Sequence, residues 1–198
     1  MTQRLSDGPR NAVFAYASLV DPLSAAATLD RPVPRIEAAV LRGWRRRWSL
    51  LRDNLNCEKT FARLDDGSRP RWILALNIEP AEEQQVVNGA LIEIASAEEL
   101  ARLDVRERRY DRVDVSGGVD SALAFDHVFA YVAKDANTAL EPPRDAVVIG
   151  AYADAVERAF DALGQLERYR EATPAPPVEV IEARLTWDEI IPGNPRAW

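Results

Sequence analysis

Near the middle of the chain, the hydrophobic pattern has a helical period with a strand-like pattern on either side. Ser96 and Glu99 have the spacing of a capping box, in which each side chain accepts a hydrogen bond from a backbone N–H of the first helical turn. This spacing predicts a helix that begins directly after Ser96. Residues 87–94 form an apolar run, and residues 110–115 alternate as strands do. The pattern therefore predicts a strand, a helix and a second strand in succession.

A carboxylate interrupts the apolar face of this predicted helix. Leu100 and Leu103 share one face, and the next position of that face is Glu107. A carboxyl group buried there costs free energy unless it is paired, and burial raises its pKa toward the range useful for proton transfer. The alternative is a solvated helix end, because Arg106 and Arg108 flank Glu107. The helix alone leaves both interpretations open.

The rest of the pattern is typical of a strand-rich fold with few helices. Apolar or alternating runs predict strands at residues 11–16, 35–50, 57–63, 72–78 and 126–132. Helices are predicted from Asp21-Pro22 onward, over residues 146–163, and over residues 165–171. Short strands of this kind close as small barrels with helices outside. We therefore expect an α+β fold: a small mixed β-barrel of short strands, one helix inserted between strands, and a C-terminal helix packed outside.

One domain is expected to contain most of the 198 residues. Residues 1–10 are polar and are predicted to be a flexible segment, residues 11–172 form the domain, and residues 173–198 form a proline-rich linker and a C-terminal extension. The extension carries Trp187 and Trp198. Because exposed indoles are unfavourable in water, we expect both to be buried against the barrel or a partner chain.

Charge and composition limit the partners and cofactors. The net charge of −7 disfavours binding to nucleic acid or anionic membranes. No apolar run approaches the ~18 residues of a membrane span, and we see no signal-peptide core, so we expect a cytoplasmic protein. The single cysteine, Cys57, and the single histidine, His127, exclude an intramolecular disulfide and a histidine metal triad, and we expect no metal and no cofactor. A Cys57–His127 nucleophile and base is the weaker hypothesis, because His127 lies in a strand pattern.

A strand end near the N-terminus is the second candidate for chemistry. The run that reaches Tyr16 ends in the small residues Ala17 and Ser18. Successive backbone N–H groups at such a turn form a concavity that holds a carboxylate. We therefore predict that the N–H groups of residues 17–19 face a cavity that also contains Glu107. The alternative is a plain buried strand end.

Several short motifs occur together over about residues 12–165. They are Phe14-Ala15-Tyr16-Ala17-Ser18-Leu19, Leu41-Arg42-Gly43-Trp44-Arg45-Arg46, Gly89 within an apolar strand, Leu103-Asp104-x-x-Glu107, and Tyr110 followed by Arg112-Val113-x-Val115. In this combination the chain resembles the gamma-glutamylcyclotransferase-like family, which carries a Tyr-Gly-Ser-Leu or Tyr-Gly-Ser-Asn turn near its N-terminus.

The resemblance implies an enzyme that releases 5-oxoproline and a free amine from a gamma-glutamyl amide or peptide, with Glu107 as general base and acid. The substrate-binding residues that it implies are Tyr16, Ala17, Ser18, Leu19, Tyr110 and Tyr131. Ala17 stands where the family has glycine. If that position needs a positive φ angle, alanine would be strained there. The inference from the family that this turn binds substrate is then weaker.

Three functions stay open at this point. The first is the cyclotransferase, whose partner is a small-molecule gamma-glutamyl substrate. The second is a non-catalytic member of the same fold that binds a small molecule or a protein. The third is a single-stranded nucleic-acid-binding module, because Trp44 and Trp48 alternate with Arg46, as aromatic and basic residues do where they stack on bases. The alternative interpretation of this segment, without a function, is a half-buried strand whose arginines lie on the surface. The apolar extension is compatible with a homodimer, and the sequence does not identify the amine, glutathione included.

Overall fold

The computed structural model describes residues 9–33 and 36–189. Its first seven strands are β1 (Asn11–Ala15), β2 (Glu37–Arg42), β3 (Trp44–Asp53), β4 (Lys59–Arg63), β5 (Trp72–Pro80), β6 (Val86–Ile94) and β7 (Tyr110–Asp114). The other five are β8 (Val119–Ser121), β9 (His127–Ala133), β10 (Ala146–Ile149), β11 (Glu179–Ile181) and β12 (Ala183–Asp188). The helices are α1 (Pro22–Leu29), α2 (Ala97–Arg106), α3 (Gly150–Ala162) and α4 (Leu166–Ala172), with 3₁₀ turns η1 (Ser18–Val20), η2 (Ser116–Gly118) and η3 (Asp135–Asn137).

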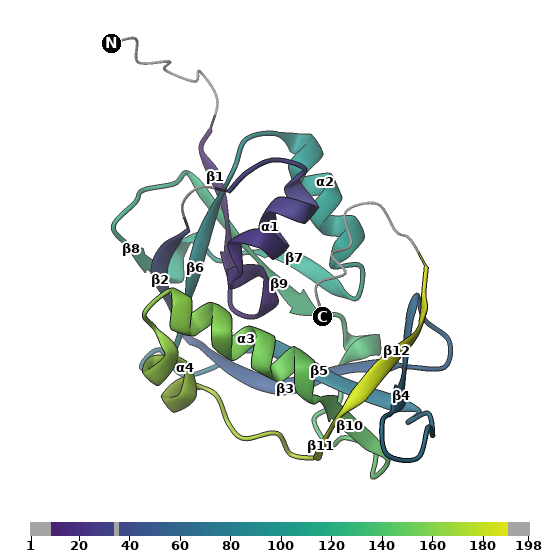
Figure 1. Cartoon of the computed structure of the whole chain (residues 1–198). Helices are drawn as coiled ribbons and strands as arrows, with labels where there is room; N and C mark the ends of the chain where they lie inside the picture. Colours follow the sequence, from purple (N-terminus) through teal and green to yellow (C-terminus); the bar gives the residue numbers. More distant parts are fainter. Residues whose placement is uncertain (1–8, 34–35, 190–198) are drawn as a thin grey trace.

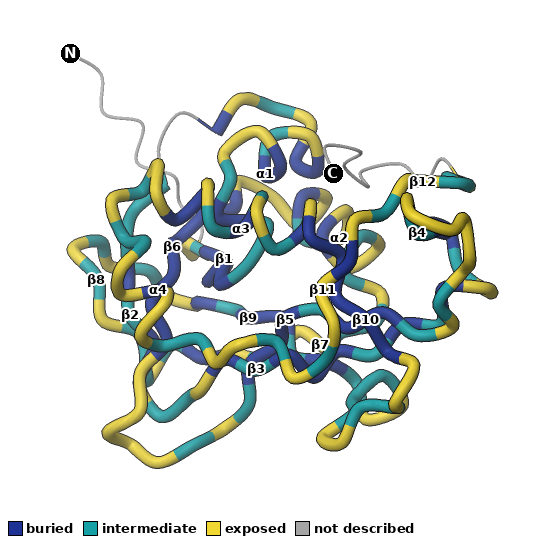
Figure 2. Tube along the Cα trace, turned by 60° about the horizontal axis from the view of Figure 1, so that its bottom comes forward, coloured by how far each residue is buried: buried dark blue, intermediate teal, exposed yellow. Residues whose placement is uncertain are grey.

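The strands form three sheets (Figure 1). The largest has the order β7-β9-β1-β6-β2-β8, and in it β1 pairs antiparallel with β6 and parallel with β9. The second has the order β11-β10-β5-β3, and the third pairs β12 with β4. The helix α3 packs against η1, and α1 packs against α2. Figure 2 shows buried segments, in dark blue, along the central strands and the inward sides of the helices.

The α+β class is confirmed, with α2 inserted between β6 and β7, but the strands described do not close into one barrel. Gly43 is the physical reason that one predicted strand is two. Its φ angle of 76° turns the chain, so that residues 37–42 join the largest sheet and residues 44–53 join the second. The prediction of a continuous strand over residues 35–50 was therefore wrong.

The segment predicted as a helix over residues 146–163 begins as a strand. Ala146–Ile149 pairs in parallel with β5 and with β11, and the helix starts only at Gly150. The β-branched side chains of Val147, Val148 and Ile149 favour an extended backbone, and all three are buried. The apolar spacing alone did not separate these two elements.

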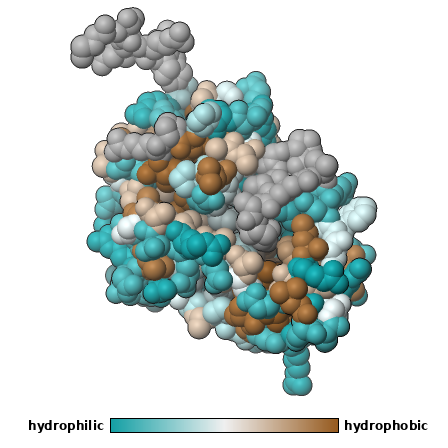
Figure 3. Space-filling model, in the orientation of Figure 1, coloured by the Kyte–Doolittle hydropathy of each residue, from teal (hydrophilic) through white to brown (hydrophobic). Residues whose placement is uncertain are grey.

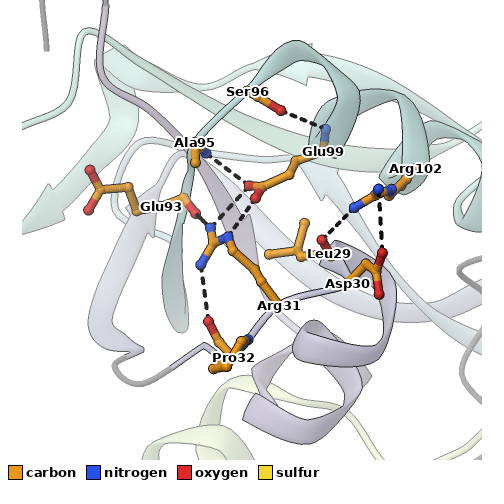
Figure 4. Close-up of polar contacts among 9 residues, drawn as sticks. All are labelled: Leu29, Asp30, Arg31, Pro32, Glu93, Ala95, Ser96, Glu99 and Arg102. Carbon is orange, nitrogen blue, oxygen red and sulfur yellow. Dashed lines mark hydrogen bonds and ion pairs between the residues drawn. The ribbon is translucent and has the colours of Figure 1, made fainter.

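The start of α2 is fixed by a buried carboxylate (Figure 4). The Ser96 hydroxyl accepts a hydrogen bond from the Glu99 N–H at 3.4 Å, as the capping box predicts. The Glu99 side chain instead accepts from the Ala95 N–H at 2.9 Å and pairs with Arg31, at 2.5 Å to Nε and 3.0 Å to Nη2. Arg31 Nη2 also donates to the Glu93 carbonyl at 2.8 Å. This network ties the helix to the segment that follows α1.

A second link between α1 and α2 lies one turn further along. Arg102 Nη1 donates to the Leu29 carbonyl at 2.7 Å, and Arg102 Nη2 lies 3.6 Å from the Asp30 carboxylate (Figure 4). Leu29 and Leu103 are both buried. The helix that Glu107 caps is therefore held against α1 at two successive turns, which gives a rigid base for a functional group.

Gly89 allows the largest sheet to pack closely. A Cβ atom at Gly89 would lie 2.3 Å from the Ala15 carbonyl oxygen and 2.6 Å from the Phe14 ring. The contact with the carbonyl cannot be relieved by a change of rotamer. We expect Gly89→Ala to lower the free energy of unfolding by ~2 kcal/mol in urea denaturation. Gly117→Ala is the control, because a Cβ there meets nothing within 4 Å; equal stability of the two variants would contradict this account.

The C-terminal part adds strands to two sheets. β11 pairs with β10, and β12 pairs with β4. Trp187, in β12, is 62% exposed, so the prediction that it is buried against the domain is wrong as far as the described residues show. Other exposed apolar side chains, Val180 and Leu185, belong to the same two strands, and hydrophobic surface gathers on this side of the molecule (lower right in Figure 3). Burial of Trp187 by a partner chain stays a prediction, while Trp198 and residues 1–8 lie outside the described residues.

None of the four helices in the described ranges is long and apolar enough to cross a membrane.

Candidate active site

A cavity of about 130 Å³ lies between β1, the turn that follows it, the C-terminal end of α2, and strands β3, β4 and β5. A cavity of roughly 150 Å³ holds benzene, so this one has room for a small organic group. The structure brings to its wall all the residues predicted for catalysis and substrate binding by the cyclotransferase: Tyr16, Ala17, Ser18, Leu19, Glu107, Tyr110 and Tyr131. These residues come from three segments of the chain: residues 16–19, residues 107–110, and the strand β9.

Glu107 is the C-cap of α2, one position past the last helical residue. Its N–H donates to the Leu103 carbonyl at 2.8 Å, and its own carbonyl accepts from the Tyr110 N–H at 2.7 Å. Its side chain is 15% exposed, and Oε1 lies 2.8 Å from Arg106 Nε. Burial raises the pKa of Glu107, and the attraction of Arg106 only partly opposes this. A carboxyl group with a raised pKa therefore lies at a fixed point of the cavity wall.

Arg106 connects Glu107 to the turn η1 and to the helix α1. Its side chain is 5% exposed, and burial lowers its pKa. Nη1 donates to Thr28 Oγ1 at 2.8 Å and to the Ser24 carbonyl at 3.1 Å, and Nη2 donates to Ser18 Oγ at 3.2 Å and Ser24 Oγ at 3.1 Å. Sequence reasoning missed this role. The available signal was a pair of hydroxyl residues four apart, Ser24 and Thr28, on an otherwise apolar helix.

The turn after β1 does not need a positive φ angle at Ala17. Ala17 has a φ angle of −143°, outside the left-handed region, so the backbone does not require glycine here. The 3₁₀ turn begins with the Val20 N–H, which donates to the Ala17 carbonyl at 2.9 Å. The N–H groups of residues 17–19 come before this first bond of the turn, and the first N–H groups of a helical turn have no partner within the turn. Ala17 therefore has no left-handed strain, and the direction of these N–H groups into the cavity stays a prediction.

Four tyrosines surround the cavity, and each hydroxyl has a partner. Tyr16 donates to the Tyr131 carbonyl at 2.6 Å, and Tyr131 donates to Asp104 Oδ1 at 2.8 Å. Tyr110 donates to the Leu76 carbonyl at 3.1 Å. The fourth, missed from the sequence, is Tyr152, which accepts from the Leu76 N–H at 3.3 Å. Burial raises the pKa of all four, so they stay protonated at neutral pH.

A scan against protein-family models finds no match, and a search of curated proteins finds none either. Solved structures do match. A gamma-glutamyl cyclotransferase superposes with a TM-score of 0.56 and 14% identity, over 87% of this chain and 94% of that one. The chain has the gamma-glutamyl cyclotransferase fold. The resemblance inferred from the sequence is confirmed at the level of the fold.

Two further structures share this cyclotransferase fold. YkqA from Bacillus subtilis matches with a TM-score of 0.55 and 17% identity, over 82% of this chain and 53% of that chain, so this chain spans about half the length of YkqA. The uncharacterized protein loc79017 from Homo sapiens matches with a TM-score of 0.54 and 15% identity, over 85% of this chain and 90% of that one.

In this example of the cyclotransferase fold, basic side chains outnumber carboxylates in the cavity wall. The ionisable arginine, lysine and glutamate residues of the lining are Arg52, Lys59, Arg106, Arg109, Glu58 and Glu107. Four cations therefore face two carboxylates, in a protein whose net charge is −7. The local field favours an anionic ligand.

Glu58, in the cavity wall, pairs with two arginines. Its carboxylate accepts from Arg109 at 2.7 and 2.6 Å and also pairs with Arg108. Burial alone would raise the pKa of Glu58, but the bonds from Arg109 and the charge of Arg108 lower it to about 2. The pairs between Glu58 and the two arginines join the turn before β4 to the segment that follows α2, on which Glu107 lies.

The lowered pKa of Glu58 predicts an acid-labile contribution to stability. A carboxyl group whose pKa is lowered on folding stabilises the native state above its ordinary pKa of 4.5, and this contribution is lost as the pH falls toward 2. In urea denaturation, we expect the parent to exceed Glu58→Gln in stability at pH 7 and the difference to shrink below pH 4.5. Glu157→Gln is the control, because its pair with Arg170 is exposed. A difference that stays constant with pH would exclude this role for Glu58.

Arg46, in β3, lies next to the turn that follows β1 and is 1% exposed. The sequence had instead favoured a surface position for the arginines of this strand. Its Nε donates to the Tyr16 carbonyl at 3.0 Å, Nη2 to the Asn88 carbonyl at 2.5 Å, and Nη1 to Thr173 Oγ1 at 2.8 Å. Trp48 is also buried, at 6% exposed. These two side chains therefore face the interior and do not form a stacking platform for nucleobases.

Cys57 and His127 have separate surroundings. Cys57 Sγ donates to the Lys59 carbonyl at 2.8 Å, and His127 Nδ1 lies 3.0 Å from Asp114 Oδ2 at an exposed position. Neither belongs to the cavity lining that the structure describes. Over residues 9–33 and 36–189, no three His, Cys, Asp or Glu side chains are grouped so that they could hold a metal ion.

Proposed function

We propose that this chain is a cyclotransferase that releases 5-oxoproline and a free amine from a gamma-glutamyl amide or peptide. The observation that supports it most is Glu107, a largely buried carboxyl group with a raised pKa in the wall of a cavity that the N-terminal turn also lines. The fold shared with a gamma-glutamyl cyclotransferase supports the same reaction.

The reaction needs proton transfer and orientation. The alpha-amine of the glutamyl group attacks its own gamma-carbonyl carbon, a C–N bond forms in a five-membered ring, and the amide C–N bond breaks. Because amine and carbonyl belong to one molecule, proximity supplies much of the rate once the chain is folded back. The attacking amine loses one proton and the leaving amine gains one. A single carboxylate between them accepts the first proton and returns it to the leaving group, so the reaction consumes no other reactant.

Glu107 is the group that we assign to this proton transfer. Its place at the end of a helix anchored to α1 fixes its position, and its raised pKa brings the carboxylate closer to the basicity that an amine requires. Arg106 positions the carboxylate through its 2.8 Å contact. The N–H groups of residues 17–19 would hold the substrate's alpha-carboxylate, and the protonated Tyr110 and Tyr131 shape the wall.

The direct test is an assay for 5-oxoproline release by the purified chain from a panel of gamma-glutamyl amides that differ in the amine. We expect at least one member to be converted, with one free amine released per 5-oxoproline. If no member is converted although the protein is folded by circular dichroism, the proposed function is wrong.

A non-catalytic binding protein is the second candidate. Ala17 supports it, because a methyl group stands where the family's glycine lets backbone approach a ligand. The same panel separates the two, since saturable binding without 5-oxoproline release identifies a binding protein.

A further inference from the structure

The Arg106 guanidinium uses all five of its N–H groups on protein acceptors. Nε pairs with Glu107 Oε1 at 2.8 Å. Nη1 donates to Thr28 Oγ1 and to the Ser24 carbonyl, and Nη2 donates to Ser18 Oγ and Ser24 Oγ. A guanidinium has five N–H donors and no acceptor. Arg106 therefore lines the cavity with its donors already committed, and its contribution there is to hold protein groups in place.

Two buried hydroxyl groups on α1 fix this guanidinium. Ser24 is 2% exposed and Thr28 is 0% exposed, and their spacing of four residues places them on one face of the helix. Thr28 Oγ1 donates to the Ser24 carbonyl at 3.2 Å, so its lone pairs are left to accept from Arg106. Because a buried guanidinium is costly wherever its N–H groups lack acceptors, these oxygens decide where it lies.

The same guanidinium joins the two parts of the site that the proposed reaction requires at a fixed separation. Its Nη2 bonds to Ser18, in the turn proposed to hold the substrate's alpha-carboxylate, and its Nε pairs with Glu107, the proposed proton carrier. A guanidinium is planar and rigid, so its place relative to α1 sets both contacts at once.

We propose that Ser24 and Thr28 are positioning residues for the cyclotransferase reaction, which hold Glu107 at its working place relative to the turn by fixing the Arg106 guanidinium. This rests on the proposed cyclotransferase function. Neither Ser24 nor Thr28 belongs to the cavity lining that the structure describes, so both act through Arg106 and not by touching the substrate.

The charges around Glu107 show what loosening Arg106 does to it. Arg106 and Arg109 both lower the pKa of Glu107, and Arg109 is held separately by Glu58. The tyrosines whose pKa Glu107 raises stay protonated at neutral pH: Tyr16, Tyr110, Tyr131 and Tyr152. The remaining charged residues of the cavity wall are Arg52, Glu58 and Lys59. A weaker pair with Arg106 therefore leaves burial less opposed, and the pKa of Glu107 rises further.

The test removes one acceptor at a time, with Ser24→Ala and Thr28→Val. Valine has nearly the shape of threonine, and alanine is favoured within a helix, so Ser24→Ala is expected to fold. Each variant should lower kcat/KM for gamma-glutamyl amides about 10- to 100-fold, because the proton carrier is displaced. Each should also move the acid limb of kcat/KM to higher pH than in the parent. Thr28→Ser, which keeps the hydroxyl group, should bring both the rate and the limb back toward the parent's.

Ser49→Ala is the matched control, because Ser49 is 0% exposed, donates to Glu79 Oε1 at 2.8 Å, and lies outside the described cavity lining. It also loses a buried hydroxyl bond, so it should lose stability while its kcat/KM stays within about twofold and its acid limb stays at the parent's pH. The proposal is overturned if Ser24→Ala and Thr28→Val keep the parent's limb, or if Ser49→Ala moves the limb as far as they do.

Failure of the underlying function has a different outcome. If the parent releases no 5-oxoproline from any gamma-glutamyl amide of the panel, the cyclotransferase function is wrong. Titration of the Glu107 carboxyl carbon by ¹³C NMR then decides the positioning role without any activity. A higher pKa of Glu107 in Ser24→Ala and Thr28→Val than in the parent supports that role, and an unchanged pKa overturns it.

Discussion

Replacing Glu107 with glutamine is expected to lower the turnover of gamma-glutamyl amides at least ~100-fold while the fold and substrate binding are retained. Glutamine keeps the shape of the side chain and an oxygen that can accept from Arg106 Nε, but it cannot take and return a proton. Arg106 also keeps its bonds to Ser18, Ser24 and Thr28, so the variant is expected to fold. The measurement is kcat from 5-oxoproline release, with substrate affinity from calorimetry.

Glu98→Gln is the matched control, because Glu98 lies on the same helix and is exposed. It should keep the parent's kcat. If Glu107→Gln also turns over at nearly the parent's rate, Glu107 is a structural residue and the cyclotransferase proposal loses its main support.

The pH dependence gives this prediction a second measurement. Only the ionised form of Glu107 accepts a proton, so the rate falls as the pH drops through its pKa. Because burial raises that pKa above 4.5, the acid limb of kcat/KM should lie at a higher pH than for an ordinary glutamate. The residual activity of Glu107→Gln should lack this limb.

Local patterns in the sequence predicted many of the elements. The cap at Ser96, the apolar runs of β1, β6 and β9, and the start of α1 at Asp21-Pro22 depend on neighbouring residues, and the structure has each of them. Glu107 was recognised because a charge in an apolar stripe is a local anomaly. It lines a cavity together with the residues predicted to bind substrate, although their roles are untested.

What the sequence did not predict depends on distant contacts. Closure into a barrel failed because Gly43 separates two strands that enter different sheets. The three buried arginines Arg46, Arg52 and Arg106 looked like surface residues, since charged side chains are mostly exposed. The partners that allow two of them to be buried are far along the chain, Thr173 for Arg46 and Ser24 for Arg106. No short-range pattern links either arginine to these distant partners.

Arg46 has the second large expected effect, this time on stability. Its guanidinium satisfies the Tyr16 carbonyl and the Asn88 carbonyl and lies 4.8 Å from the centre of the Tyr169 ring. Burial lowers the pKa of Arg46 to about 10, so its charge is disfavoured and the hydrogen bonds offset that cost. Arg46→Met removes the donors and leaves these buried carbonyls unpaired, at ~1–3 kcal/mol each. We expect the free energy of unfolding to fall by ~3 kcal/mol in urea denaturation.

Two comparisons show whether hydrogen-bond geometry or charge is responsible. Arg46→Lys keeps a cation but cannot reach several acceptors at fixed angles, so it should lose most of the same stability. Arg45→Met, on the neighbouring position, removes an arginine whose side chain is 48% exposed, and it should change stability by less than ~1 kcal/mol. Because Arg46 holds the Tyr16 carbonyl at the start of the turn, Arg46→Lys should also raise KM for gamma-glutamyl amides more than it lowers kcat. If both Arg46 variants unfold at the parent's urea concentration, the buried network contributes nothing to the fold, and the turn is held by other contacts.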